Sequence, residues 1–262
     1  MKIGFIGGGN MGGALIGGLT SKCCAPEEVT LFEINDEKAQ KYKELGVRIA
    51  ESAAEVEDAS EIIVFSVKPN VIDSVLQHMK GSDSKIYLSI AAGVTVSHLE
   101  KMLGADKKIV RAMPNTPAQI GHGMTVISPN ANMNEDDIKK VKMILSAVGM
   151  VREIDEMFMS VATALHGSSP AYVYMMIDAM ADAGVKYGLS KEQALCLAAQ
   201  AVAGSAEMVL ASGLHPEQLK DNVCSPGGTT IAAVCDLEEK GFRSVVQSAV
   251  CACVERAEEM SK

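Results

Sequence analysis

Near its start the chain carries Gly7-Gly8-Gly9-Asn10-Met11-Gly12, which fits the spacing G-x-G-x-x-G. The first glycine of such a loop permits a tight turn, the second lets a pyrophosphate approach the main chain, and the third allows close packing of helix on strand. N–H groups at the start of the following helix would then hold the phosphates. Because the motif directly follows the apolar run 2–6 and opens a helical pattern, it predicts a dinucleotide-binding loop rather than an ordinary glycine-rich turn.

An acidic residue stands where the ribose of such a cofactor would lie. Glu33 follows Gly7 by 26 residues, at the end of the second predicted strand. A carboxylate there accepts a hydrogen bond from the ribose 2′-hydroxyl and repels a 2′-phosphate. No arginine follows in Ile34-Asn35-Asp36. This pattern favours NADH over NADPH, and the alternative is a solvated glutamate at a strand end.

Three more loops of unusual composition follow predicted strands, and these are Ser66-Val67-Lys68-Pro69, Ala91-Ala92-Gly93-Val94 and Met113-Pro114-Asn115-Thr116-Pro117. Ligands of an open parallel sheet gather at the carboxyl ends of its strands. In the third loop two prolines prevent helix formation, so a rigid polar turn is available to orient a nicotinamide carboxamide. A purely structural turn is the alternative.

A pattern suited to a carboxylate lies in the second half, at Ser225-Pro226-Gly227-Gly228-Thr229-Thr230. It precedes a predicted helix over residues 231–240. Glycines and threonines at a helix start present main-chain N–H groups and hydroxyls to an anion. An ordinary helix cap needs only one serine or threonine, so the doubled glycines and threonines favour an anion site.

The elements that must position these residues differ between the two halves. Residues 1–160 alternate strands with helices, which predicts an α/β, Rossmann-type domain with a mostly parallel sheet. The predicted strands are 3–6, 29–33, 62–67, 86–90, 108–113, 124–128 and 151–154. The predicted helices between and after them are 11–21, 37–45, 71–79, 96–103 and 135–148.

Residues 161–262 lack strand patterns and predict an all-α domain. The segments 170–187 and 191–212 are almost apolar all round, apart from a thin polar stripe at Asp178, Asp182 and Lys186. A helix without a broad polar face must be buried on nearly every side. About a hundred residues cannot easily bury two such helices, so we expect an interlocked homodimer. A compact monomeric bundle is the alternative.

Composition limits the partners. The net charge of −9, without a basic stripe, argues against nucleic acid. The apolar runs are too short or too interrupted for a membrane span, and the glycine-broken N-terminus is not a signal peptide. The seven cysteines are scattered without pairing or zinc spacing. We therefore expect a cytoplasmic protein with reduced thiols and no metal.

With these motifs placed, the sequence resembles the pyrroline-5-carboxylate reductases along essentially its whole length. The matching segments are GFIGGGNMG at 4–12, VKP at 67–69, AAGVT at 91–95, RAMPNTP at 111–117, GSSPAYV at 167–173 and LKDNVCSPGGTTI at 219–231. The resemblance implies an NAD(P)H-dependent oxidoreductase acting on a C=N bond. It implies reduction of 1-pyrroline-5-carboxylate to L-proline, and chains that pair through the C-terminal domain.

The resemblance also implies roles for individual residues. The cofactor would lie along Ile6, Gly7, Gly8, Gly9, Asn10, Met11, Gly12, Glu33, Ser66, Val67, Lys68, Pro69, Ala92 and Asn115. The substrate would lie at Ser225, Pro226, Gly227, Gly228, Thr229 and Thr230. Thr230 matches the family threonine whose hydroxyl reaches the ring nitrogen, and Ser225 is expected to shape the carboxylate pocket.

Two residues depart from the family pattern, and three alternative functions remain open. His166 stands where the family usually has serine, and Glu33 stands where many members have small or hydroxylated residues that serve NADPH. A hydroxyacid dehydrogenase of similar build would need a basic side chain, for which His166 and Lys186 are the nearest candidates. A related cyclic imine reductase is the second alternative. A dinucleotide-sensing binding protein is the third, and it would not need the turn at 225–230.

Overall fold

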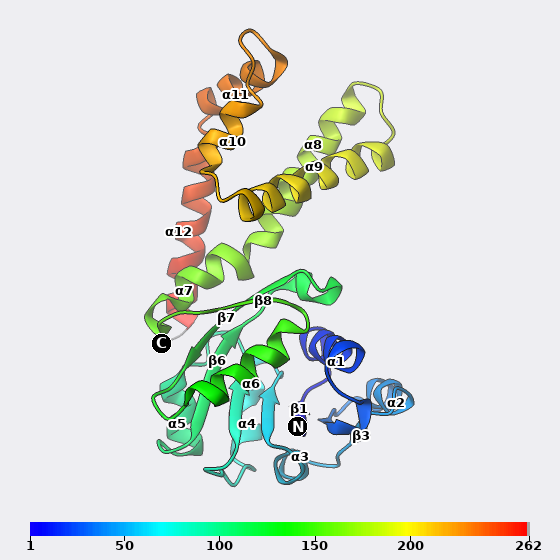
Figure 1. Cartoon of the computed structure of the whole chain (residues 1–262), viewed down its shortest axis with the longest axis vertical. Coiled ribbons are helices and arrows are strands. Elements are labelled where there is room, and N and C mark those ends of the chain that lie inside the picture. Colours follow the sequence, from blue (N-terminus) through cyan, green and yellow to red (C-terminus); the bar gives the residue numbers. More distant parts are fainter. Residues whose placement is uncertain (261–262) are drawn as a thin grey trace. The chain divides into compact units, whose positions relative to one another are not determined.

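The computed structural model describes residues 1–260 and divides them into two compact units (Figure 1). The first unit is Met1–Ser168 together with the described residues from Val254 onward, and the second is Ser169–Cys253. The boundary expected after residue 160 falls earlier than this division. The reason is that the π-helical turn Thr163–Gly167 is hydrogen-bonded through His166 to Met113 and Asn115 of the first unit.

The first unit is built on one eight-stranded sheet with the order β3-β2-β1-β4-β5-β6-β7-β8. All neighbouring strands are parallel except the pair β6 and β7. The predicted α/β fold with a mostly parallel sheet is therefore confirmed. The strands are β1 (Ile3–Ile6), β2 (Val29–Phe32), β3 (Arg48–Ile49), β4 (Ile62–Phe65), β5 (Ile86–Ser89), β6 (Lys108–Met113), β7 (Gly123–Pro129) and β8 (Gly149–Glu153).

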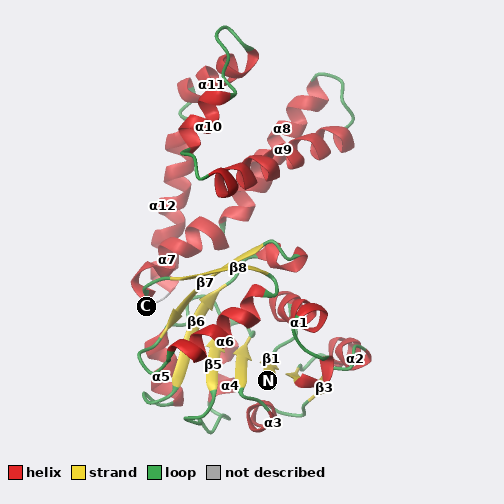
Figure 2. Cartoon of the chain, viewed as in Figure 1, coloured by secondary structure: helices red, strands yellow, loops and turns green. Residues whose placement is uncertain are grey.

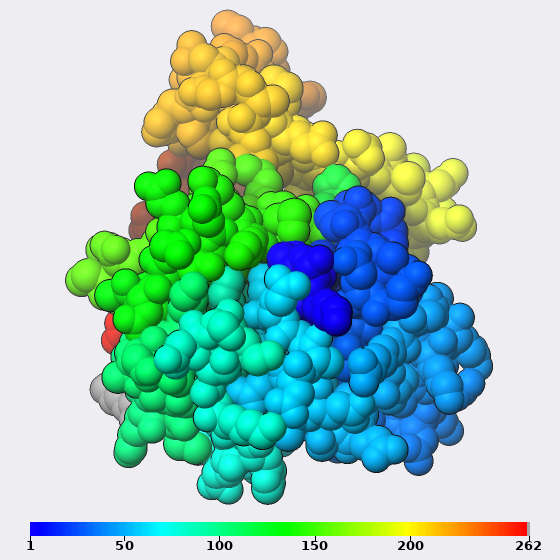
Figure 3. All heavy atoms as spheres, turned by 60° about the horizontal axis from the view of Figure 1, so that its bottom comes forward, coloured from blue at the N-terminus to red at the C-terminus, as the bar shows by residue number. Residues whose placement is uncertain are grey.

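Helices cover both faces of this sheet (Figure 2), because successive strand residues point to opposite sides. Ile3, Phe5 and Val64 pack on one face with α1 (Asn10–Lys22) and α6 (Glu135–Ser146). The other face carries Ile63 and Phe65 and is covered by α3 (Ala53–Ala59), α4 (Pro69–Leu76) and α5 (Val96–Leu103). In the space-filling view the blue, cyan and green atoms of this unit form a closely packed surface (Figure 3).

Most predicted elements of this unit are present within one to three residues of their expected ends. The strand β3 and the helix α3 were not predicted. β3 contains only two residues, so it has no periodic pattern to detect. The helix α2 (Asp36–Glu44) forms as expected, with Asn35 capping its first turn through a hydrogen bond from the N–H of Lys38.

The second unit contains α8 (Ser169–Lys186), α9 (Lys191–Ser212), α10 (Pro216–Asn222), α11 (Thr229–Glu239) and the first part of α12 (Phe242–Met260). Helices α8 and α9 pack side by side (Figure 1). At the start of α9, Ser190 and Gln193 form a capping box. Two residues of the predicted polar stripe form ion pairs with the first residue of α9. Lys191 Nζ lies 2.6 Å from a carboxylate oxygen of Asp178 and 2.6 Å from one of Asp182.

Much apolar side-chain surface of this hairpin is exposed in the single chain. Its buried residues are Ala181, Ala194 and Ala198, whereas Met175 is 74% and Leu210 71% exposed. A compact monomeric bundle would bury these side chains, so the structure does not support that alternative. By length and composition, α9 also reaches what a membrane span needs, contrary to the expectation from sequence.

Candidate functional site

The glycine loop lies at the point where the strand order of the sheet reverses. β1 is flanked by β2 and β4, whose crossovers run to opposite sides, and the crevice at their carboxyl ends is where open α/β sheets bind ligands. Gly7 directly follows β1 and has a φ of +99°, a conformation that favours glycine. A Cβ on Gly7 would lie 2.8 Å from the main-chain oxygen of Ser66. The Ser66 hydroxyl in turn donates a 2.6 Å hydrogen bond to the Gly7 carbonyl.

The other two glycines of the motif meet different surroundings. A Cβ on Gly12 would lie 2.5 Å from the Gly7 oxygen, so the third glycine permits α1 to pack against the loop. Around Gly9, by contrast, a Cβ would meet open space. Gly9 is also the N-cap residue of α1 and has no side chain to occupy the first N–H groups of the helix. The start of α1 is therefore suited to an anionic group.

Glu33 lies beside this loop and is anchored at both carboxylate oxygens. Its Oε2 accepts a 2.7 Å hydrogen bond from the N–H of Gly8, and its Oε1 accepts one of 2.9 Å from the N–H of Asn35. A cavity of about 280 Å³ opens here. It brings together half of the residues expected at the cofactor, namely Ile6, Gly7, Gly9, Glu33, Ser66, Val67 and Lys68.

Two other expected cofactor residues, Pro69 and Ala92, line a neighbouring hollow of about 710 Å³. Its walls come from α4, from the loop after β5 and from α5. Across it, His98 Nε2 lies 2.6 Å from Asp73 Oδ1, which joins α5 to α4. Both hollows lie beside the carboxyl ends of the central strands, where the sequence placed the ligand.

Asn115 is buried and its side chain is already hydrogen-bonded at both ends. Its Nδ2 donates to the main-chain oxygen of His166 at 3.0 Å, and its Oδ1 accepts from the N–H of Met124 at 2.8 Å. The two imidazole nitrogens of His166 lie 2.5 Å and 2.8 Å from the carbonyl oxygens of Ala162 and Met113. These contacts hold the turn after β6 in place. The cofactor contact expected of Asn115 stays a prediction.

The turn at Ser225–Thr230 belongs to the second unit and opens α11. Gly227 has a φ of +67°, and the N–H of Gly228 donates a 3.0 Å hydrogen bond to the carbonyl of Ser225, which closes the turn. Gly228 is the N-cap of α11 and has no side chain to cap the helix. Thr229 and Thr230 are the first two residues of this 11-residue helix. Main-chain N–H groups at such a helix start suit a carboxylate.

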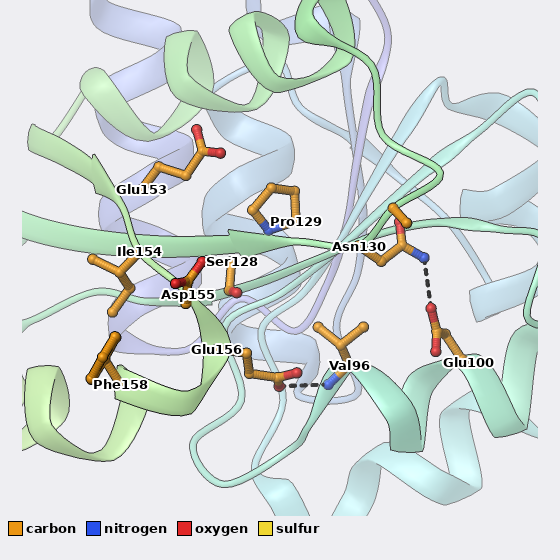
Figure 4. A pocket seen from close by; sticks show the side chains of 11 residues that line it. Val96, Glu100, Ser128, Pro129, Asn130, Glu153, Ile154, Asp155, Glu156 and Phe158 are labelled. Atoms are coloured by element: carbon orange, nitrogen blue, oxygen red, sulfur yellow. Dashed lines mark hydrogen bonds between the residues drawn. The ribbon is translucent and has the colours of Figure 1, made fainter.

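Another cavity, of about 840 Å³, is lined in part by the carboxylates of Glu100, Glu153, Asp155 and Glu156 (Figure 4). Glu156 accepts hydrogen bonds from the N–H of Val96 at 2.8 Å and from Arg111 at 3.0 Å, and Asn130 donates to Glu100 at 2.9 Å. Acidic walls disfavour an anionic cofactor or substrate. Within residues 1–260 no group of three or more His, Cys, Asp or Glu side chains is placed to hold a metal ion.

One residue beside the glycine loop was not anticipated. The hydroxyl of Tyr42, on α2, donates a 2.9 Å hydrogen bond to the Gly8 carbonyl. The available signal was that Tyr42 is the single aromatic residue of a helix that is otherwise mostly charged. Its partner lies 34 residues earlier in the chain, so the pairing itself is not visible in the sequence.

Known proteins resemble this chain over its full length. Residues 156–260 match the family described as pyrroline-5-carboxylate reductase dimerisation, and residues 2–93 match the one described as NADP oxidoreductase coenzyme F420-dependent. A pyrroline-5-carboxylate reductase of Escherichia coli (strain K12) is 48% identical, with 100% of this chain and 98% of the relative covered.

Solved structures agree with this. The pyrroline carboxylate reductase of Plasmodium falciparum with NADP bound is 38% identical with a TM-score of 0.89, and the pyrroline-5-carboxylate reductase of Coxiella burnetii is 34% identical with a TM-score of 0.94. Each comparison covers 100% of this chain and 98% of the other. The chain is an oxidoreductase that acts on a C=N bond, and it belongs to the pyrroline-5-carboxylate reductase family.

Proposed function

We propose that this enzyme delivers hydride from a nicotinamide cofactor to the imine carbon of 1-pyrroline-5-carboxylate and forms L-proline, as the last step of proline biosynthesis. The observation that carries the proposal is the glycine-capped start of α11 at Ser225–Thr230, present together with the glycine loop of the first unit. A dinucleotide-sensing protein has no need of a carboxylate turn. A hydroxyacid dehydrogenase needs a basic side chain for its alcohol proton, which this turn does not supply.

The residues of the turn divide between binding and catalysis. The main-chain N–H groups of Thr229 and Thr230 bind the substrate carboxylate, while Ser225, Pro226, Gly227 and Gly228 shape its pocket. Fixing the carboxylate fixes the position of the ring, which is the main requirement when the acceptor is already reactive. The hydroxyl of Thr230 hydrogen-bonds the ring nitrogen and orients or relays its proton.

The nicotinamide, when bound, would supply the hydride that adds to the imine carbon, C2 of the pyrroline ring, which becomes C5 of proline. The π electrons of the C=N bond then pass to the nitrogen, which keeps the proton of the iminium and takes a second proton from water, so that proline leaves as the protonated amine. Because a cyclic imine is basic enough to bind partly protonated, the protein needs no strong general acid. The chain's own contribution is placement and hydrogen bonding, which suits a site built from amides and hydroxyls.

We further propose that the cofactor rests on Ile6 to Gly12, Ser66 to Pro69, Ala92 and Asn115, and that NADH is preferred over NADPH. Glu33 is held beside Gly8 by two main-chain N–H groups, so its charge cannot easily turn away from a 2′-phosphate. Asp36 and Glu37, in the first turn of α2, add negative charge nearby. The Plasmodium falciparum relative was solved with NADP, so a preference for NADH would distinguish this chain from a relative that binds NADP.

The assembly we propose is a homodimer that covers the apolar surfaces of α8 and α9. Its support is the match of residues 156–260 to the dimerisation family and the exposed apolar side chains of those helices. Within this proposal the apolar surface of α9 faces protein rather than lipid. A cytoplasmic location, and the lack of nucleic-acid and membrane partners, stay expectations from the sequence.

A spectrophotometric assay of NADH and NADPH against a panel of small acids tests the function. We expect the absorbance of the reduced cofactor to fall with pyrroline-5-carboxylate and to stay constant with 2-oxo acids, the oxidised partners of hydroxyacids. Turnover of the 2-oxo acids alone would favour the hydroxyacid dehydrogenase. Cofactor binding without turnover of any acid would favour the sensing protein.

A further inference from the structure

Gly8, in the middle of the glycine loop, has both of its main-chain polar groups hydrogen-bonded to side chains. Its N–H donates to Glu33 Oε2 at 2.7 Å, and its carbonyl accepts from the Tyr42 hydroxyl at 2.9 Å. Three consecutive glycines give this segment more backbone freedom than any other sequence would. The two hydrogen bonds from side chains to Gly8 therefore restrict the backbone conformations of the whole loop.

The ring of Tyr42 also accounts for two glycines that the dinucleotide motif does not require. The motif needs glycine at positions 7, 9 and 12, yet positions 8 and 13 are glycine as well. A Cβ on Gly8 would lie 2.7 Å from Cε2 of Tyr42, and a Cβ on Gly13 would clash with the Tyr42 hydroxyl. Both glycines thus make room for the tyrosine. The loop and α2 are fitted to each other at this point.

The hydroxyl is held in its donating form. Burial of the half-buried side chain, with a smaller effect from the charge of Glu33, raises the pKa of Tyr42 above its ordinary value. Tyr42 therefore remains protonated, and able to donate its hydrogen bond to Gly8, throughout the neutral pH range.

We propose that Tyr42 is a positioning residue for the dinucleotide: its hydroxyl, acting with Glu33, fixes the Gly8 backbone so that the N–H groups at the start of α1 face the pyrophosphate. This inference rests on the proposed cofactor site. Its physical basis is preorganisation, because a loop that is ordered before binding loses less conformational entropy when the cofactor binds. Tyr42 acts on the loop and leaves the adenosine to Glu33, so it affects NADH and NADPH alike.

Binding of each dinucleotide by calorimetry, with kcat at saturating cofactor, tests this on the full-length enzyme. Tyr42→Phe is expected to raise the Kd of NADH and of NADPH by the same factor, roughly three- to tenfold, as for one lost hydrogen bond. The value of kcat should be unchanged. The matched control is Tyr87→Phe, which removes a buried hydroxyl of the central strand β5 that donates to Glu57 at 2.6 Å, outside the glycine loop. It should lower the melting temperature without changing either Kd.

A second variant keeps the test independent of any effect of Tyr42→Phe on stability. Gly13→Ala displaces the hydroxyl and should weaken binding in the wild-type background. In the Tyr42→Phe background it should be nearly neutral, because the next ring atom, Cζ, lies 3.6 Å from the new Cβ. Additive effects of the two substitutions would contradict the inference.

Three other outcomes are decisive. Wild-type affinity in a folded Tyr42→Phe protein would overturn the inference, and a changed ratio of NADH to NADPH affinity would overturn the positioning role by placing the hydroxyl on the adenosine. Failure of the wild-type enzyme to bind either dinucleotide would instead refute the proposed function, together with the inference that rests on it.

Discussion

The side-chain amide of Asn115 donates a 3.0 Å hydrogen bond to the main-chain oxygen of His166, 51 residues further along the chain. The imidazole of His166 returns a contact of 2.8 Å to the carbonyl of Met113. Together these bonds tie the turn after β6 to the π-helical turn Thr163–Gly167. The sequence predicts Asn115 as a cofactor ligand and shows His166 as a departure from the family pattern; in the structure one hydrogen bond joins the two residues.

This pairing predicts that Asn115→Ala lowers stability. Truncation leaves the N–H of Met124 and the carbonyl of His166 without their partner, which costs about 1–3 kcal/mol for buried groups. Urea unfolding followed by circular dichroism measures the change. If stability is unaltered while the KM for the cofactor rises, the amide is a cofactor ligand, as the sequence suggested.

For Glu33 we predict control of cofactor choice. The wild-type enzyme should show a higher kcat/KM with NADH than with NADPH, since the anchored carboxylate repels a 2′-phosphate. Glu33→Ser should reduce the difference in kcat/KM between the two cofactors. It should do so by raising kcat/KM with NADPH, by an amount equivalent to about 1–2 kcal/mol. Steady-state kinetics with both cofactors give the ratio directly. A wild-type enzyme that clearly prefers NADPH would refute the proposed role of Glu33.

The substitution Thr230→Ala tests the catalytic assignment. It should lower kcat/KM for the imine by roughly 1–3 kcal/mol, about five- to 150-fold, which is the range for one lost hydrogen bond. The Kd of the cofactor should change little, because the glycine loop belongs to the other compact unit. Turnover at the wild-type rate would reduce Thr230 to a helix-cap residue. Loss of cofactor binding would show that the two ends of the site were assigned the wrong way round.

The dimer can be tested at a single exposed leucine. Leu210 on α9 is 71% exposed in one chain, and in the proposed homodimer a charge there would be buried without a partner. Leu210→Glu should therefore weaken association by roughly 100-fold or more, measured by light scattering across a dilution series. The control Met143→Glu alters a 46% exposed residue of α6 in the first unit and should leave the mass unchanged. An active monomer of the wild-type chain at micromolar concentration would exclude the dimer.

Local patterns carried much of the fold. The strand β1 and the helices α5 and α9 depend on the residue pattern of short segments, and all three were predicted from the sequence. The loop at residues 7–12 was predicted because its glycines have the spacing of a dinucleotide-binding loop and stand between a predicted strand and a predicted helix. The two-residue strand β3 was missed because it has no period.

The contacts that refine the site are long-range, and this is why the sequence did not reveal them. Tyr42 reaches Gly8 across 34 residues, and Asn115 turns inward to His166 across 51. A polar residue in a loop looks the same in sequence whether its side chain faces a ligand or the protein. Only the fold of the first unit decides between these directions.

The most direct test of the central claim follows the hydride itself. The enzyme is incubated with pyrroline-5-carboxylate and with nicotinamide cofactor deuterated at C4 on the transferred face, and the product is analysed by mass spectrometry and NMR. We expect L-proline with one deuterium, located at C5. Unlabelled product, deuterium at another carbon, or no proline at all would contradict the central claim.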